Sequence, residues 1–185
     1  MRVMSIDAST SSTGWAVFDG KELNTYGCIK SSKDDWRNRI ADMVDELDKI
    51  IKQYDGIERI YVEDVPLKSQ NPMTLKQLSV LQGALLGMAI GNKIYIEFVP
   101  LTYWRRKAGL YDGTKEGLKR PEMKKKSIEL ANKTWNLNLI YKSPSSKFNQ
   151  DDEADGLNLG AAMVGIHNYD EEKTTKKTLG KKARI

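Results

Sequence analysis

Three strand-like segments follow one another at the start of this chain with no helix between them, and this order strongly limits its fold. Residues 2–6, 14–18 and 23–29 are apolar and β-compatible, and an Asp19-Gly20 turn signal separates the second from the third. Connections this short join antiparallel strands. The sequence therefore predicts a three-stranded meander before any helix begins.

Helix and strand patterns alternate in the next part of the chain. Residues 35–54 carry apolar side chains at steps of three and four, which is typical of an amphipathic helix. A strand pattern at 59–62, a helix pattern at 71–91 and a strand pattern at 93–99 follow. Strands joined by a crossover helix are usually parallel. We therefore predict an α/β fold whose five-stranded mixed sheet is flanked by helices.

The remaining residues contain two helix patterns and two polar loops. We expect a mobile loop at 110–120, a helix from about Pro121, a second loop at 143–150 and a last helix from Asp151 to Ile166. After Tyr169 the chain has few apolar residues to bury.

The 185 residues fit a domain that needs no disulfide or zinc to fold. We predict one domain over residues 1–169 and a basic, disordered tail over residues 170–185. A single cysteine, Cys28, excludes a disulfide framework and favours a buried structural thiol. The N-terminus has no signal-peptide pattern and the apolar runs are shorter than a bilayer span, so we expect a cytoplasmic protein without a membrane partner.

Charge is distributed unevenly along the chain. Residues 100–150 carry 12 Lys and Arg against 4 Asp and Glu, residues 151–172 carry 7 acidic residues and no basic ones, and residues 173–185 carry 6 basic residues and no acidic ones. Basic stretches attract a polyanion, whereas an acidic cluster repels it unless cations neutralise the cluster. Solvated surface explains many lysine-rich stretches, but the combination favours a nucleic-acid partner.

Four carboxylates stand where the predicted elements end or begin. Asp7 ends the first strand and Glu63 the fourth, while Asp152 and Asp155 lie three residues apart at the start of the last helix. Each alone has an ordinary explanation as a turn residue or helix cap, and Asp64 points to the other side of its strand. A fold that gathers all four needs a divalent cation, because like charges repel. We therefore predict a metal-dependent nuclease.

Phosphodiester hydrolysis requires an activated water and a stabilised leaving oxygen. Two Mg²⁺ ions held by carboxylates supply both, and Mn²⁺ is a common substitute. This chemistry needs no histidine base, and the single histidine, His167, lies about three helical turns beyond Asp155. The predicted catalytic residues and metal ligands are Asp7, Glu63, Asp152 and Asp155.

Four segments resemble the RuvC Holliday junction resolvases, in the small form carried by some bacteriophages. They are residues 6–17, 62–65, 77–89 and 152–156. The resemblance implies an RNase H-like fold, a homodimer, and the activity of a crossover junction endodeoxyribonuclease, which cuts four-way DNA junctions by paired nicks with Mg²⁺. It places the family's metal-binding acids at the four carboxylates named above. If a phage encodes the chain, its place of work is the host cytoplasm.

Basic residues near the predicted site are expected to hold the DNA backbone. The predicted contacts are Arg105, Arg106, Lys107, Lys119, Arg120, Lys124 and Lys125. In the resemblance, Lys107 and Lys124 match lysines that lie near the scissile phosphate. Aromatic residues among these charges, such as Trp104, fit either base stacking or core packing.

One position departs from the family pattern. Bacterial members carry an aromatic residue three positions after the second acid, where this chain has Pro66. We therefore expect a broader range of branched substrates that includes three-way junctions and forks.

Two other functions fit parts of the sequence. An actin- or hexokinase-type ATP-binding phosphotransferase also sets an Asp before a small hydroxylated turn, as at residues 7–14, but it needs a second phosphate loop that we do not find. A non-catalytic basic DNA-binding module explains the basic residues and leaves the acids without a role. Glycines at 83, 87 and 91 fit either close helix contact in a dimer or packing on the chain's own sheet.

Overall fold

A five-stranded sheet forms the centre of the computed structural model, which describes residues 1–65, 71–111 and 119–169. The strands lie in the order β3-β2-β1-β4-β5. Their bounds are β1 (Arg2–Asp7), β2 (Ser12–Asp19), β3 (Glu22–Lys30), β4 (Ile57–Glu63) and β5 (Tyr95–Val99). The first three strands pair antiparallel, and β1, β4 and β5 run parallel. The predicted mixed sheet is confirmed.

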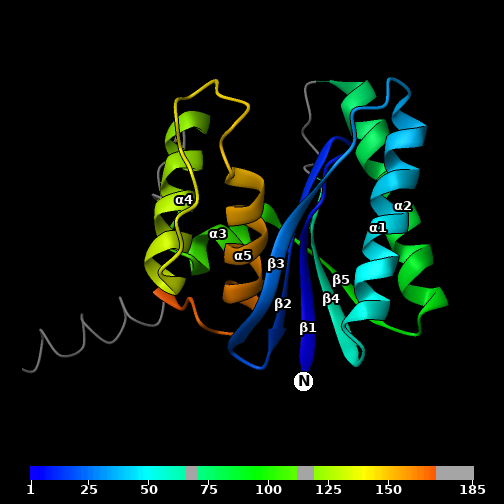
Figure 1. Cartoon of the computed structure of the whole chain (residues 1–185), viewed down its shortest axis with the longest axis horizontal. Coiled ribbons are helices and arrows are strands. Elements are labelled where there is room, and N and C mark those ends of the chain that lie inside the picture. Colours follow the sequence, from blue (N-terminus) through cyan, green and yellow to red (C-terminus); the bar gives the residue numbers. More distant parts are fainter. Residues whose placement is uncertain (66–70, 112–118, 170–185) are drawn as a thin grey trace, which may run out of the picture.

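Helices cover both faces of this sheet (Figure 1). One layer holds α1 (Trp36–Gln53) and α2 (Pro72–Gly91). The other holds α3 (Leu101–Lys107), α4 (Arg120–Trp135) and α5 (Asp151–Met163). The sheet therefore separates two apolar cores.

Alternate residues of each inner strand point into different cores, as the pleat of a strand requires. On β1, Val3 belongs to the core beneath α5, whereas Met4 and Ile6 belong to the core beneath α1 and α2. On β4, Tyr61 faces α5 and its neighbours Ile60 and Val62 face the opposite layer. Between Val3 and Asp7 on β1, and between Ile60 and Glu63 on β4, the odd-numbered positions thus point to the α5 layer.

The predicted helix starts are confirmed by their caps. The side chain of Asp35 accepts a hydrogen bond from the backbone N–H of Arg37, and Asn71 accepts from those of Met73 and Thr74. These bonds satisfy backbone donors that an uncapped helix leaves free.

Some predicted boundaries are wrong for reasons of backbone geometry. Strand β5 begins at Tyr95 and not at residue 93, because Lys93 has a φ of 59°. Helix α5 ends at Met163 and not at Ile166, because Gly165 adopts a φ of 77° just beyond it. Helix α3, directly after Pro100, was not predicted.

Three sequence predictions concern residues outside the described ranges. These are most of the loop at 110–120, Pro66 and the basic tail at 170–185.

Among the described residues, α2 is the helix long and apolar enough to cross a membrane by length and composition, with a mean hydropathy of 1.2. One side of it belongs to the core, through Leu81, Leu85 and Met88. The other side exposes Val80 and Ile90, which are 44% and 67% accessible. This helix therefore carries apolar residues on two faces, one of which no described residue covers.

Candidate functional site

Asp7 and Glu63 end two adjacent parallel strands and point to the same side of the sheet. Asp7 follows Val3 and Ser5 on the α5 side of β1, and Glu63 follows Tyr61 on the α5 side of β4. Because β1 and β4 pair in parallel, both strands end at the same edge. In Figure 1 this edge is the upper end of the sheet, opposite the N-terminus.

The first turn of α5 lies directly against this edge. Ser5 donates a hydrogen bond of 2.7 Å to the carbonyl oxygen of Gly156. Gly14, which pairs with Asp7 across β1 and β2, is so close to α5 that a Cβ there would lie 1.7 Å from the carbonyl oxygen of Asp152. A side chain at Gly14 is therefore excluded, and this close packing sets the position of Asp152 and Asp155.

Repulsion among the four carboxylates is evident from their pKa values. The pKa of Asp7 is raised well above its usual value, first by burial and then by the charges of Glu63, Asp155 and Asp152. Burial raises the pKa of Glu63 to about 7, with Asp155 adding to the effect. The structure thus brings together all four acids that the sequence singled out.

Asp152 and Asp155 are also buried, and burial disfavours their charged form. Burial raises the pKa of Asp155 to about 6, although Arg105 and a hydrogen bond from Ser127 oppose the shift. Burial likewise raises the pKa of Asp152, against a hydrogen bond from Ser12. An apolar surrounding that holds several carboxylates favours a bound cation.

Each of three carboxylates has a hydrogen-bond donor from a different element. The hydroxyl of Ser12 donates to Asp152, and that of Ser127, on α4, donates to Asp155. The indole Nε1–H of Trp104 donates to Glu63 Oε2 over 2.9 Å. Trp104 is fully buried, so core packing and this bond, and not base stacking, define its place.

A second set of buried polar groups stands behind Ser127. Asn158 Nδ2 donates to the carbonyl and hydroxyl oxygens of Ser127, each over 2.9 Å, and Asn158 Oδ1 lies 3.2 Å from His167 Nε2. Burial lowers the pKa of His167 to about 4, so the ring is neutral and its Nε2–H can donate to Asn158. The histidine therefore supports the site from a distance.

Two of the predicted basic residues lie at the carboxylates. Arg105 Nη2 is 3.7 Å from Asp155 Oδ2, and its buried Nε has no hydrogen-bond partner. Lys124 Nζ is 2.5 Å from Asp151 Oδ2, one residue before Asp152. Asp151 thus pairs with a lysine beside the site.

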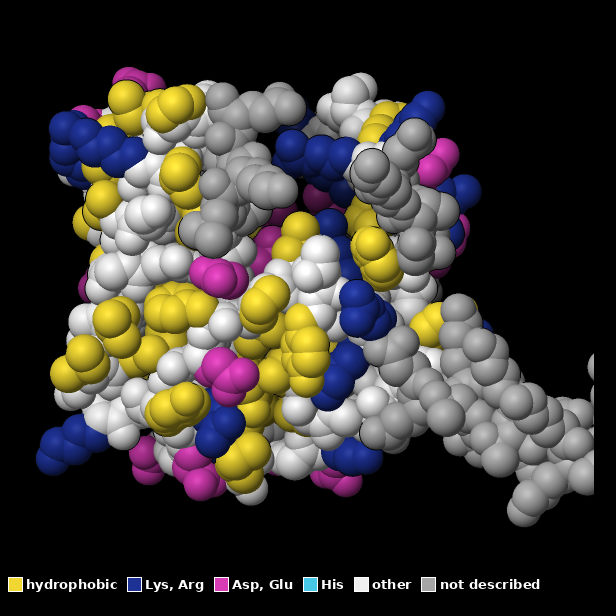
Figure 2. Space-filling view, turned by 180° about the vertical axis from the view of Figure 1, so that it is seen from behind, with side chains coloured by type: hydrophobic (Ala, Val, Ile, Leu, Met, Phe, Trp, Pro, Cys, Tyr) yellow, Lys and Arg dark blue, Asp and Glu magenta, His cyan; other side chains and the backbone are white. Residues whose placement is uncertain are grey.

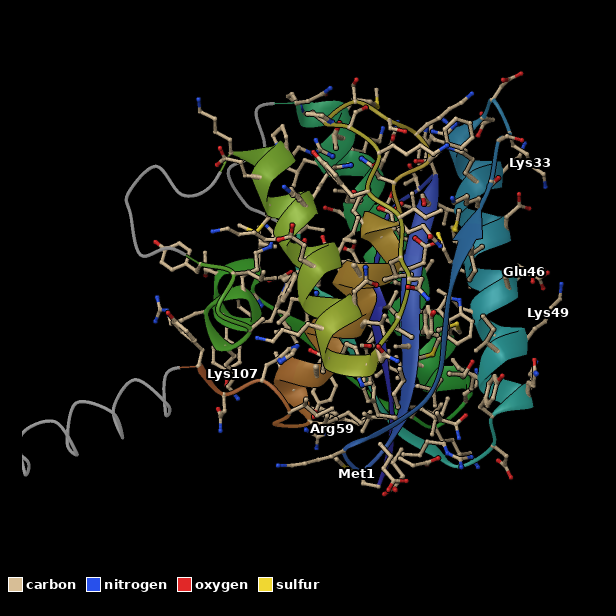
Figure 3. All side chains as sticks on the ribbon, turned by 60° about the vertical axis from the view of Figure 1, so that its left-hand side comes forward. Met1, Lys33, Glu46, Lys49, Arg59 and Lys107 are labelled. Atoms are coloured by element: carbon tan, nitrogen blue, oxygen red, sulfur yellow. The ribbon has the colours of Figure 1, made fainter. Side chains whose placement is uncertain are left out.

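The other predicted basic residues are placed elsewhere. Lys107 lies 5.2 Å from the ring centroid of Tyr103 and lines a cavity with Lys133 and His167. Figure 3 shows it toward the end of the molecule that carries Arg59 and Met1, away from the start of α5. Lys119 and Arg120 are exposed at the start of α4, Lys125 pairs with Glu129, and Arg106 stacks on Tyr111.

The donor set suits a hard divalent cation, although the side chains do not yet converge on one point. Among the residues that the structure describes, no three His, Cys, Asp or Glu side chains are arranged to hold a metal ion. Their oxygens are instead turned toward Ser12, Trp104, Ser127 and Arg105. Carboxylate oxygens are the ligands that Mg²⁺ and Mn²⁺ prefer. The pKa values of all four carboxylates are raised, so a cation bound among them would favour their charged form.

Several residues of the site could not be recognised in advance. Ser127, Asn158 and Trp104 reach the carboxylates only through the packing of α3, α4 and α5. Ser12 lies in a run of small hydroxylated residues after Asp7, which was the one visible signal.

Figure 2 shows this region from behind as a hollow near the top of the molecule, with acidic and basic side chains inside it. The hollow lies between the α1–α2 layer and the layer of α3, α4 and α5.

Comparison with known proteins identifies one family and one fold. The family described as "Crossover junction endodeoxyribonuclease RuvC" matches residues 3–110. No curated protein sequence matches the chain.

Solved structures of Holliday junction resolvases share the fold at low sequence identity. RuvC of Thermus thermophilus, in complex with a Holliday junction substrate, has a TM-score of 0.61 and 14% identity, covering 88% of this chain and 92% of that one. The yeast mitochondrial resolvase Ydc2 has a TM-score of 0.55 and 15% identity, covering 88% and 77%. Fowlpox virus resolvase, also with junction DNA, has a TM-score of 0.52 and 17% identity, covering 89% and 97%. The predicted RNase H-like fold is confirmed.

Proposed function

The chain belongs to the RuvC family of crossover junction endodeoxyribonucleases, and from this premise we propose that it resolves four-way DNA junctions by paired nicks. The carrying observation is that the two parallel strand ends and the first turn of α5 bring Asp7, Glu63, Asp152 and Asp155 together. Mg²⁺ is the proposed cofactor, with two ions per site and Mn²⁺ as a substitute. We further propose that the enzyme works in the cytoplasm.

The four carboxylates are the proposed metal ligands and catalytic residues. Mg²⁺ held by them supplies an activated water and stabilises charge on the leaving oxygen. Ser12, Trp104 and Ser127 fix the orientation of three of the carboxylates by hydrogen bonds. The chain's own contribution is a set of oxygen ligands held in place before the substrate arrives.

Arg105 has a second proposed role at the same site. Without a metal it partly neutralises Asp155, at 3.7 Å. Cations bound by the carboxylates would take over that task, and the guanidinium would then be available to a phosphate oxygen. Lys124 pairs with Asp151, the neighbour of Asp152 in the chain, and is proposed to contact the same strand.

The start of α4 and the end of α3 supply the wider proposed DNA surface. Lys119 and Arg120 are exposed at the first turn of α4, and Lys125 follows on its outer side. Arg106 and Lys107 lie on α3, further from the carboxylates, and are proposed to touch DNA arms and not the scissile phosphate. Such contacts are sequence-independent, as a structure-selective enzyme requires.

A homodimer is proposed because two symmetric nicks need two sites related by a two-fold axis. The exposed face of α2 suits this contact, since Val80 and Ile90 are 44% and 67% accessible. Gly83 and Gly87 lie on the same face, and a Cβ at either would meet nothing within 4 Å. Packing against the described residues therefore does not explain these glycines, whereas close approach of a second helix does.

The substrate is proposed to be branched DNA in general, with the four-way junction included. Two of the similar solved structures, from Thermus thermophilus and fowlpox virus, are complexes with Holliday junctions. Pro66 replaces the aromatic residue of bacterial members, so we propose that three-way junctions and forks are also cut.

The test is nicking of synthetic branched DNA by the wild-type protein and by an Asp7→Asn variant. We expect Mg²⁺-dependent paired nicks from the wild type, and lost nicking with retained junction binding from Asp7→Asn. Asp64→Asn is the matched control, because Asp64 points to α2 and accepts a hydrogen bond from Gln82 over 3.3 Å. Equal nicking by Asp7→Asn, or ATP binding in place of DNA cleavage, would refute the proposal.

A further inference from the structure

An exposed aromatic ring stands on a tightly bonded loop next to the carboxylates. Phe148 is 60% accessible and belongs to neither apolar core. The loop that carries it is held by Asn149, which is 5% accessible, donates to the carbonyl of Ser143 over 2.8 Å and accepts from the N–H of Lys142 over 2.8 Å. The backbone N–H of Phe148 itself donates to the Ser146 hydroxyl over 3.2 Å. The loop is therefore built to hold an apolar ring in solvent.

Positive charge surrounds this ring. Lys142 Nζ lies 4.5 Å and Lys147 Nζ 5.8 Å from its centroid, within the range of cation–π attraction. Cation–π contact explains why the lysines stay close, but it does not explain why the ring is exposed. Rings interleaved with cations are typical of surfaces that bind single-stranded nucleic acid.

A basic cavity of about 340 Å³ opens beside the same loop. Its walls are Arg120, Pro121 and Lys124 of α4, and Pro144, Ser145, Ser146 and Lys147 of the loop. Lys124 pairs with Asp151, which lies outside the cavity wall, at 2.5 Å, and none of the wall residues themselves is acidic. Two hydroxyls and an excess of positive charge suit a phosphate group.

The loop and the carboxylates are close enough to touch one DNA strand. Phe148 precedes Asp152 by four residues, which limits their Cα separation to about 14 Å. Successive nucleotides of a strand rise about 3.4 Å in a duplex. Figure 1 shows the loop at the same end of the molecule as the strand ends and the start of α5. The Cα atoms of Phe148 and Asp152 are therefore separated by no more than the rise of about four nucleotides.

We propose that Phe148 stacks on an unpaired base near the branch point while the basic cavity holds the adjoining backbone phosphate. This inference rests on the proposed function and adds a contact that selects distorted DNA over plain duplex. A duplex offers its bases only inside the stack, whereas a branch point exposes the face of a base. The phosphate contact serves any strand, so selection comes from the ring.

The experiment measures binding of a four-way junction and of a linear duplex in Ca²⁺, with 2-aminopurine replacing bases near the cut sites. For Phe148→Ala we expect roughly tenfold weaker junction binding, loss of the 2-aminopurine signal and unchanged duplex binding. Phe148→Trp should retain the signal, because it keeps a stacking surface. Lys147→Gln should weaken both substrates alike and reduce the salt slope by about one.

Tyr95→Ala is the matched control. Tyr95 is 58% accessible and lies 4.6 Å from the guanidinium of Arg59, so it is also an exposed ring beside a cation. Figure 3 shows Arg59 at the opposite end of the molecule from the loop. We expect Tyr95→Ala to bind both substrates as the wild type does.

Each outcome bears on a different claim. If the wild type cuts junctions and Phe148→Ala keeps both its affinity and its 2-aminopurine signal, the stacking role is refuted and the proposed function stands. Equal losses on junction and duplex would also refute it, since the ring would then give no selectivity. A wild type that neither binds nor cuts junctions would overturn the proposed function together with this inference.

Discussion

Replacing Glu63 by glutamine should stabilise the metal-free protein while abolishing its activity. Glu63 is held among other carboxylates, and burial raises its pKa from 4.5 to about 7. Such a shift corresponds to about 3 kcal/mol at a pH above both values. Because the side chain keeps some contact with solvent, we expect a gain of about 2 kcal/mol in the free energy of unfolding of Glu63→Gln. Glutamine retains an oxygen for the Trp104 hydrogen bond.

The sign of the pH dependence makes this prediction specific. Below pH 4.5 the carboxyl is neutral in both the folded and the unfolded chain, and the variant gains nothing. As the pH rises, the unfolded chain loses its proton first, so wild-type stability falls until the pH passes about 7. The advantage of Glu63→Gln should therefore be largest at pH 7.5 and below about 1 kcal/mol at pH 5.

Urea unfolding in EDTA, followed by tryptophan fluorescence, measures the effect. Glu58→Gln is the control on the same strand, since its side chain is 64% accessible and its neutralisation should change stability by less than about 0.5 kcal/mol. Saturating Mg²⁺ should reverse the order, because it stabilises a folded protein by about 2.7 kcal/mol at a hundred times its Kd. A variant less stable than the wild type in EDTA at pH 7.5, or an equal gain at pH 5, would refute the reasoning.

Three other changes test the surroundings of the site. Ser127→Ala removes the hydrogen-bond donor to Asp155 and a partner of Asn158. We therefore expect the free energy of unfolding in urea to fall by about 1–3 kcal/mol and nicking to require more Mg²⁺. The control is Thr134→Val, whose hydroxyl donates to the Leu130 carbonyl of the same helix, and it should leave the Mg²⁺ requirement unchanged. Gly14→Ala places a Cβ on the carbonyl oxygen of Asp152 and should lower the free energy of unfolding by about 3 kcal/mol. A thermal melting curve equal to that of the wild type would contradict the close packing of α5 against β2. Ile90→Glu should give a monomer in light scattering, whereas the same change at Ile140, which is 48% accessible in another layer, should leave the dimer; a dimeric Ile90→Glu would exclude the α2 face.

The local sequence was enough to predict which ends of the strands and of the last helix hold the four carboxylates. The positions of Asp7 and Glu63 at strand ends, and the spacing of Asp152 and Asp155, follow from periods of two and 3.6 residues. These periods also assign Asp64 to the opposite face, where it meets Gln82. The three-stranded meander and the starts of α1 and α2 were predictable because turn signals and helical periodicity act within a few positions.

Contacts between distant elements were not predictable in this way. Ser127 and Asp155 are 28 residues apart, and Trp104 reaches Glu63 from 41 residues away. Lys107 and Lys124 matched the resemblance equally well, and only the packing of α3 and α4 separates them. Helix α3 has seven residues, too few for a periodic pattern to stand out after Pro100.

Titration of Mn²⁺ into the metal-free protein, by calorimetry, tests the central claim most directly. The account predicts saturable binding at pH 7.5 that weakens as the pH falls through about 7 and then about 6, where Glu63 and then Asp155 take up a proton. Asp7→Asn should weaken this binding at least about tenfold, because one oxygen ligand and one negative charge are lost. Wild-type protein that binds no Mn²⁺ at millimolar concentrations, or an Asp7→Asn isotherm equal to that of the wild type, would contradict it.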